Sequence, residues 1–131
     1  MDYSKMSDQE INMVVASIIY PDRVVIESKS RPPSACITSH HPSKWVDYCN
    51  NPEDAWPIIV GHKLSLINAD DEWLCVPDDT AVDGTTGDEV QMIYSGDGHV
   101  HANPLRAAMI VFLMMKKSAN VQANSARPDI R

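Results

Sequence analysis

The residues with the most obvious metal-binding chemistry are five histidines and three cysteines. They are His40, His41, His62, His99, His101, Cys36, Cys49 and Cys75. Structural zinc sites are usually built from ligand pairs at short spacing, such as CxxC or HxxxH. Here only His99 and His101 have a spacing that could chelate one ion from an extended strand, and no second pair accompanies them. We therefore expect exposed loop histidines, with no bound metal and no other cofactor.

The segment from Asp79 to Val90 places carboxylates at some positions of a calcium-binding loop. Asp79, Asp83 and Gly84 correspond to its positions 1, 5 and 6. However, position 3 is Ala81, and position 12, which should be a bidentate Glu, is Val90. A standard EF-hand loop is therefore excluded, since the pattern fails where negative charge is most needed.

No pattern of a nucleophilic enzyme is present. The sequence contains no GxSxG, and its glycines are too scattered for a phosphate-binding loop. Cys49 precedes a predicted helix start, where a thiol pKa can be lowered, but a buried structural cysteine is the favoured interpretation. We predict no catalytic residue.

Three tryptophans could in principle stack on nucleic-acid bases. Such stacking normally comes with a basic groove, and no basic cluster surrounds Trp45, Trp56 or Trp73. We expect these three side chains to pack in or near the core.

Acidic residues are concentrated in the middle of the chain, whose formal net charge is −7. Residues 64–105 contain nine acids, the last of them Asp97, and no Lys or Arg. This composition disfavours direct nucleic-acid binding, which needs cations to neutralise phosphates. The alternatives are a solvated loop face that only keeps the protein soluble, or a face that binds a basic protein. The residues of that predicted face are Asp70, Asp71, Glu72, Asp78, Asp79, Asp83, Asp88 and Glu89.

The first helix is predicted by a capping box, in which Ser7 and Glu10 can each bond the other's amide. Pro21 should end it. Its apolar residues recur at helical spacing and predict a buried face. They are Ile11, Val14, Val15, Ile18 and Ile19.

Short β-branched runs predict strands at 23–28 and 35–39, followed by an irregular connection over 40–50. Asn51 and Pro52 begin a second helix that should run to Val60. Residues 64–68 and 72–76 flank a turn at Asp70-Asp71 and predict a hairpin, with residues 89–94 as a third antiparallel strand.

The most apolar helix is predicted from Asn103, its N-cap, to Lys117. Its apolar run is too short to span a bilayer, which needs about 20 residues, so protein must cover it. Arg106 and Lys117 should mark its polar stripe. Because apolar residues lie between them, either this domain or a second copy of the chain must cover that stripe, which makes a homo-oligomer possible. Those apolar residues are Met109, Ile110 and Leu113.

This order of elements predicts the α+β class, with a small antiparallel sheet packed against the long C-terminal helix and two further helices. Residues 1–118 should form one domain and residues 119–131 a polar, disordered tail. The first residues lack the features of a signal peptide, and three widely spaced cysteines are typical of reduced thiols, so we expect a cytoplasmic protein without membrane association.

Three blocks of the chain resemble the NinX-like proteins of lambdoid phages and enterobacterial prophages. They are the opening MDYSKMSDQEIN, then YCNNPEDAWPIIV at 48–60, and NPLRAAMIVFLMMKKSANVQANSA at 103–126. The resemblance implies a phage early-region gene expressed in a bacterial cytoplasm, without an activity or catalytic residues to carry over. The final helix also looks like that of small phage α-β-α sandwich domains, which supports the fold alone.

We therefore predict a phage accessory protein that is a non-enzymatic module and binds a basic host or phage protein through its acidic face. The alternative is a small-molecule or nucleotide binding protein, or an enzyme, that uses Trp73, His99 and His101. A third possibility is a purely structural, oligomerising role.

Overall fold

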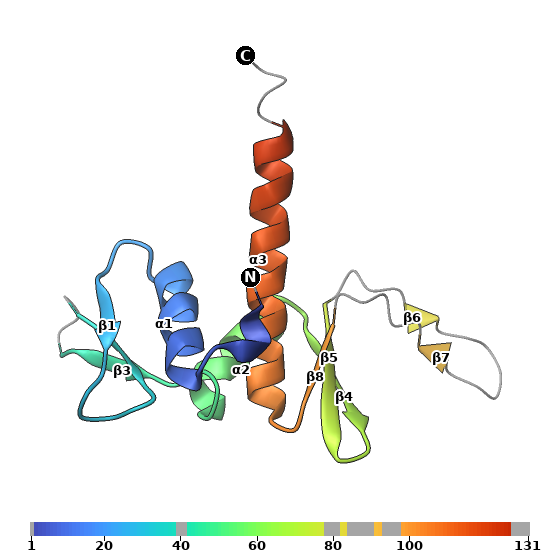
Figure 1. Cartoon of the computed structure of the whole chain (residues 1–131), viewed down its shortest axis with the longest axis horizontal. Coiled ribbons are helices and arrows are strands. Elements are labelled where there is room, and N and C mark those ends of the chain that lie inside the picture. The colour runs from blue at the N-terminus through green and yellow to red at the C-terminus, as the bar shows by residue number, and fades with distance from the viewer. Residues whose placement is uncertain (1, 39–41, 78–81, 84–90, 93–97, 127–131) are drawn as a thin grey trace.

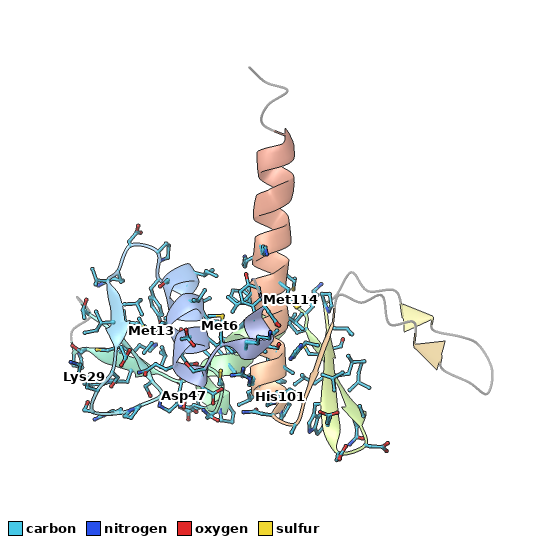
Figure 2. The ribbon with its side chains drawn as sticks, viewed as in Figure 1. Met6, Met13, Lys29, Asp47, His101 and Met114 are labelled. Atoms are coloured by element: carbon cyan, nitrogen blue, oxygen red, sulfur yellow. The ribbon has the colours of Figure 1, made fainter. Side chains whose placement is uncertain are left out.

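The computed structural model describes residues 2–38, 42–77, 82–83, 91–92 and 98–126. Its central element is helix α3 (Pro104–Ala126), which stands between two small sheets (Figure 1). The side chains of residues 107–113 in α3 are all at most 2% exposed, so its first half forms the core of the molecule. Figure 2 shows side chains of α1 and of the N-terminal turn close to this half of α3.

One sheet lies beside helix α1 (Asp8–Ile19). It contains β1 (Val25–Glu27), β2 (Ala35–Ile37) and β3 (Lys44–Val46), all antiparallel, in the order β1-β2-β3. The strand β3 was not predicted, because residues 40–50 carry little local signal. Its pairing with β2, Cys36 opposite Trp45, creates the strand.

The second sheet packs directly on α3. It contains β4 (Ser65–Ala69), β5 (Glu72–Val76) and β8 (His99–His101) in the order β4-β5-β8. The β4–β5 hairpin and its Asp70-Asp71 turn are confirmed. The prediction for the third strand was wrong, since β8 pairs with β5. Within the predicted third strand, the structure describes only Gln91–Met92, which is β7 and pairs with β6 (Val82–Asp83).

The remaining elements are the short 3-10 turn η1 (Tyr3–Lys5) and helix α2 (Pro52–Gly61). Asn51 caps α2 as predicted, with its side chain accepting the amide of Glu53. The α+β class is therefore confirmed, but the described strands divide into two three-stranded sheets and the two-stranded β6–β7 sheet rather than forming one. The predicted division into a domain (1–118) and a tail stays a prediction.

The buried face of α1 differs from the predicted one. Ser7 and Glu10 form the capping box, but Asn12 and Ala16 are fully buried, whereas Val14 and Ile19 are each 37% exposed. Burial of the Asn12 amide is possible because its Nδ2 donates to the carbonyl of Pro33, just before β2, and to Oδ1 of Asp47, just after β3.

Two further predictions about side chains and helix length were wrong. Trp56 is 59% exposed rather than packed in the core, because it lies on the outer face of α2. Helix α3 continues past Lys117 to Ala126, since its following residues include no proline or glycine before Pro128. An apolar run shows where a helix is covered, and the helix itself can extend further.

The apolar stripe of α3 is covered within the chain. Met109, Ile110 and Leu113 are buried, so this stripe no longer argues for a second copy of the protein. Among the residues that the structure describes, none of the helices combines the length and the apolar character needed to cross a bilayer.

Candidate functional site

The predicted acidic face is described in part. Asp70 and Asp71 form the turn at the tip of the β4–β5 hairpin, Glu72 begins β5, and all three are exposed. Asp70 adopts a φ of 62°, a conformation that Asp and Asn tolerate better than most residues. Its amide donates to Oδ1 of Asn68 at 3.0 Å, which supports the turn. These three acids therefore lie together in sequence and in space.

The other predicted acids do not extend this cluster in the described structure. Asp83 belongs to β6. The remaining four, Asp78, Asp79, Asp88 and Glu89, lie outside the described residues.

Trp73, His99 and His101 share one side of the second sheet. Trp73 lies opposite His101, and Cys75 lies opposite His99, so the alternation of strand side chains directs all four the same way. Cys75 is fully buried on that side, which faces α3. The structure therefore brings together the residues of the alternative prediction.

The two histidine rings lie nearly parallel, with 6.5 Å between their centroids and 18° between their planes. Nδ1 of His101 accepts the backbone amide of Asn103 at 2.9 Å, which assigns the proton of a neutral ring to Nε2. Partial burial, and then the neighbouring His101, lowers the pKa of His99. The neutral form of His99 is therefore favoured, and this form offers one donor and one acceptor.

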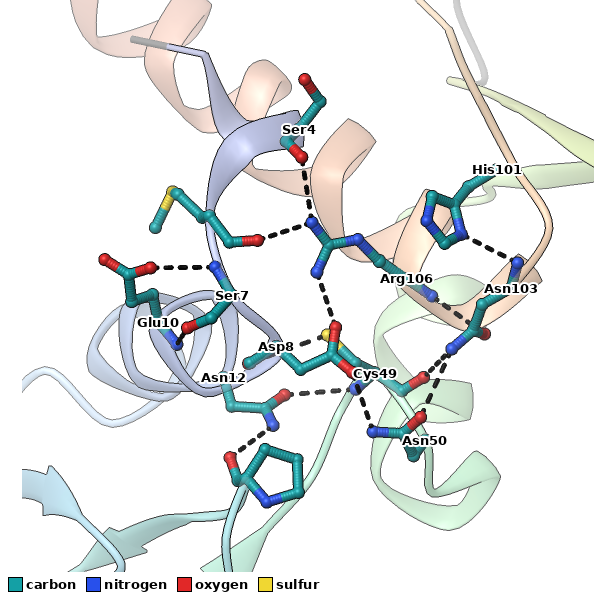
Figure 3. A network of polar contacts seen from close by, with 12 residues as sticks. Ser4, Ser7, Asp8, Glu10, Asn12, Cys49, Asn50, His101, Asn103 and Arg106 are labelled. Carbon is teal, nitrogen blue, oxygen red and sulfur yellow. Dashed lines mark hydrogen bonds and ion pairs between the residues drawn. The ribbon is translucent and has the colours of Figure 1, made fainter.

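Arg106 is the polar residue whose role sequence reasoning missed. It is only 8% exposed and not part of a solvent-facing stripe as predicted. Its Nη1 forms an ion pair with Oδ1 of Asp8 at 2.6 Å, while Nη2 donates to the carbonyl oxygens of Ser4 at 3.2 Å and Met6 at 2.6 Å (Figure 3). Burial is tolerated because a carboxylate and two carbonyls satisfy the guanidinium. Arg106 thereby fastens the N-terminal turn to α3.

A second set of contacts joins α3 to the loop before α2. The side-chain oxygen of Asn103 accepts the amides of Leu105 and Arg106, as predicted for an N-cap, and its Nδ2 donates to the Cys49 carbonyl at 2.7 Å (Figure 3). Asn12 accepts the Cys49 amide at 3.2 Å. Burial raises the pKa of the Cys49 thiol well above its usual range. Cys49 is thus a structural residue rather than an activated nucleophile.

A cavity of about 380 Å³ lies where the N-terminal turn, β8 and α3 meet. Its polar groups come from all three elements, and its aliphatic side chains come from α3. The lining residues are Asp2, Tyr3 and Ser4 of the N-terminal segment, His99 of β8, and Ile110, Met114 and Lys117 of α3. Sequence patterns give no signal for this site, because its walls come from three segments distant in the chain.

A smaller cavity of about 220 Å³ lies between α1, β3 and α2. Two of its charged groups already have partners in the protein. Nζ of Lys44 donates to the hydroxyl of Tyr20 at 3.0 Å, and Oδ2 of Asp54 accepts the amide of Asp47 at 2.9 Å. It is therefore the weaker candidate for a ligand site.

Metal and thiol chemistry find little support in the described part of the chain. No group of three or more His, Cys, Asp or Glu side chains there is placed to hold a metal ion. Cys36, Cys49 and Cys75 are all buried and free of disulfides.

Comparison with known proteins gives one match. No curated protein and no solved structure matches the chain at a significant level. The family model described as "Bacteriophage P22, NinX" matches residues 2–116. This range includes the N-terminal turn, both three-stranded sheets, and the Asp8–Arg106 ion pair that joins α1 to α3. The protein therefore belongs to the NinX family of bacteriophage P22.

Proposed function

We propose that this phage accessory protein is a non-enzymatic binding module whose acidic hairpin tip binds a basic host or phage protein. The observation that carries the proposal is the exposed group of Asp70, Asp71 and Glu72 at the end of the β4–β5 hairpin. Figure 1 shows this tip at the end of the sheet farthest from α1 and the first sheet, where a partner could approach it.

The charge distribution supports the same proposal. The whole segment 64–105 contains nine acids and no Lys or Arg. No lysine or arginine of this segment can therefore neutralise the negative charge of the hairpin tip. Such a field attracts basic surfaces and repels phosphates, which favours a protein partner over nucleic acid. The partner would act in the bacterial cytoplasm, where we place this protein.

The hairpin is also a rigid support for these carboxylates. Five residue pairs join β4 to β5, from Ser65 opposite Val76 to Ala69 opposite Glu72. The base of the hairpin is anchored by Cys75 and Val76, which are at most 1% exposed. Carboxylates held on such a scaffold lose little entropy when they bind a partner.

A second candidate function is the binding of a small molecule by the side of the sheet that carries Trp73, His99 and His101. It is favoured by their common orientation toward α3.

The protein-binding proposal is tested by an affinity pull-down of the tagged full chain from phage-infected host lysate, with quantitative mass spectrometry of the eluate. The test variant is the double substitution Asp70→Asn and Asp71→Asn, because asparagine tolerates a positive φ and preserves the turn. The matched control is Asp22→Asn with Glu27→Gln, two exposed acids elsewhere that change the net charge equally.

We expect a basic protein that the wild type and the control retain at low salt, that high salt releases, and that the hairpin variant fails to retain. The proposal is contradicted if the hairpin variant and the control retain the same proteins.

A further inference from the structure

The cavity at the N-terminal turn is lined by both apolar and polar side chains. Ile110 is 1% exposed, and Met114 is half-buried beside it. A volume of about 380 Å³ lies within the range of small-molecule sites in proteins. This arrangement suits a ligand with an apolar body and few polar atoms.

The polar groups of the cavity determine the charge of that ligand. Lys117 is exposed at the cavity and makes no ion pair with any described residue. In contrast, Oδ1 of Asp2 accepts both the amide and the hydroxyl of Ser4, so its carboxylate is already engaged in the turn. Lys117 is the one cation among the described lining residues and favours a ligand with one negative charge, while the nearby carboxylate of Asp2 disfavours polyanions such as nucleotides.

The ring of His99 supplies a neutral polar group on the β8 side. Its nitrogens make no hydrogen bond with the described residues, although the neighbouring His101 is bonded to Asn103. The His99 ring is held in place by stacking on His101. A ring whose nitrogens are bonded to no described residue can therefore recognise one donor or acceptor of a ligand.

We propose that this cavity binds a small organic monocarboxylate, with its apolar body on Ile110 and Met114 and its carboxylate at Lys117. The N-terminal turn forms one wall of the site, and Arg106 holds that wall through the carbonyls of Ser4 and Met6. This site is separate from the acidic hairpin tip, so either can exist without the other.

The experiment uses three probes of the same size that differ in charge, namely benzoate, benzamide and benzylamine. Each is titrated into the ¹⁵N-labelled full chain in the millimolar range, and amide chemical shifts are followed by NMR. We expect saturable shifts with benzoate at the amides of Ser4, His99 and Lys117, and weaker binding of the neutral and cationic probes.

Two lysine variants separate the site from general charge attraction. Lys117→Gln should weaken benzoate binding by about three- to fivefold, as expected for loss of one partly screened ion pair. Lys116→Gln changes the net charge equally, but the Lys116 ammonium lies over the Phe112 ring and not in this cavity, so it should leave the affinity unchanged. Asp70→Asn with Asp71→Asn should also leave benzoate binding unchanged.

The proposal is overturned if none of the three probes causes saturable shifts at these amides. It is also overturned if benzamide or benzylamine binds as tightly as benzoate, or if both lysine variants weaken binding equally. The NMR spectrum of each variant shows directly whether it is folded, so a misfolded protein would not be mistaken for loss of the site.

Discussion

Arg106 at the start of α3 and Asp8 at the start of α1 form an ion pair with 2.6 Å between Nη1 and Oδ1, although 98 positions separate them in the chain. The same guanidinium bonds two carbonyls of the N-terminal segment. One side chain therefore joins α1, α3 and a wall of the proposed cavity.

Arg106→Met should lower the free energy of unfolding by about 2–4 kcal/mol, because it leaves Asp8 and two carbonyls without their partner. Urea denaturation measures the change. Lys5→Met removes an exposed cation of the same segment and should change the stability by no more than about 0.5 kcal/mol. If Arg106→Met lowers the free energy of unfolding no more than Lys5→Met is expected to, the Arg106 contacts contribute no net stability.

Asn103→Ala should cost about 1–2 kcal/mol, because the substitution removes both the cap of α3 and the bond to the Cys49 carbonyl. Asn103→Ser restores a capping oxygen but not the donor to Cys49, so its stability should lie between wild type and alanine. If serine is no better than alanine in thermal and urea unfolding, the capping contribution is refuted.

Phe112→Ala should cost about 3–5 kcal/mol, since Phe112 is fully buried in the core and its ring meets that of His62 at a centroid distance of 4.8 Å. Trp56→Ala removes a larger but mostly exposed side chain and should cost less than about 1 kcal/mol. Urea denaturation followed by circular dichroism compares the two, and a similar loss in both would place Trp56 in the core after all.

The three thiols should react with a disulfide reagent such as DTNB far more slowly in the native protein than in urea. All three are buried, and burial raises the pKa of Cys75 to about 12, so the reactive thiolate is scarce at pH 8. Stopped-flow absorbance gives the rates, with the three thiols released in urea as the reference. A thiol that reacts at its unfolded rate in native protein would contradict its burial.

Local features of this protein were predictable from sequence. The Ser7–Glu10 capping box, the Asn51 and Asn103 caps and the Asp70-Asp71 turn each depend on residues within one turn of one another. Their hydrogen bonds form between near neighbours, so the residue types are sufficient to indicate them.

Pairing between distant segments was less predictable. Residues Lys44–Val46 form strand β3 because they pair with β2. The strand that pairs with β5 is β8, and not the predicted strand at residues 89–94. Such short strands have too few residues for a clear alternation, so their partners are decided by the packing of the whole chain.

The same distinction separates the two proposed sites. The acidic hairpin tip follows from sequence alone, because three consecutive acids at a turn must be exposed together. The cavity of His99 and Lys117, and the burial of Arg106, were decided by tertiary structure. Only folding brings residues 2–4, 99 and 110–117 together, and only the fold supplies the partners that allow a guanidinium to be buried.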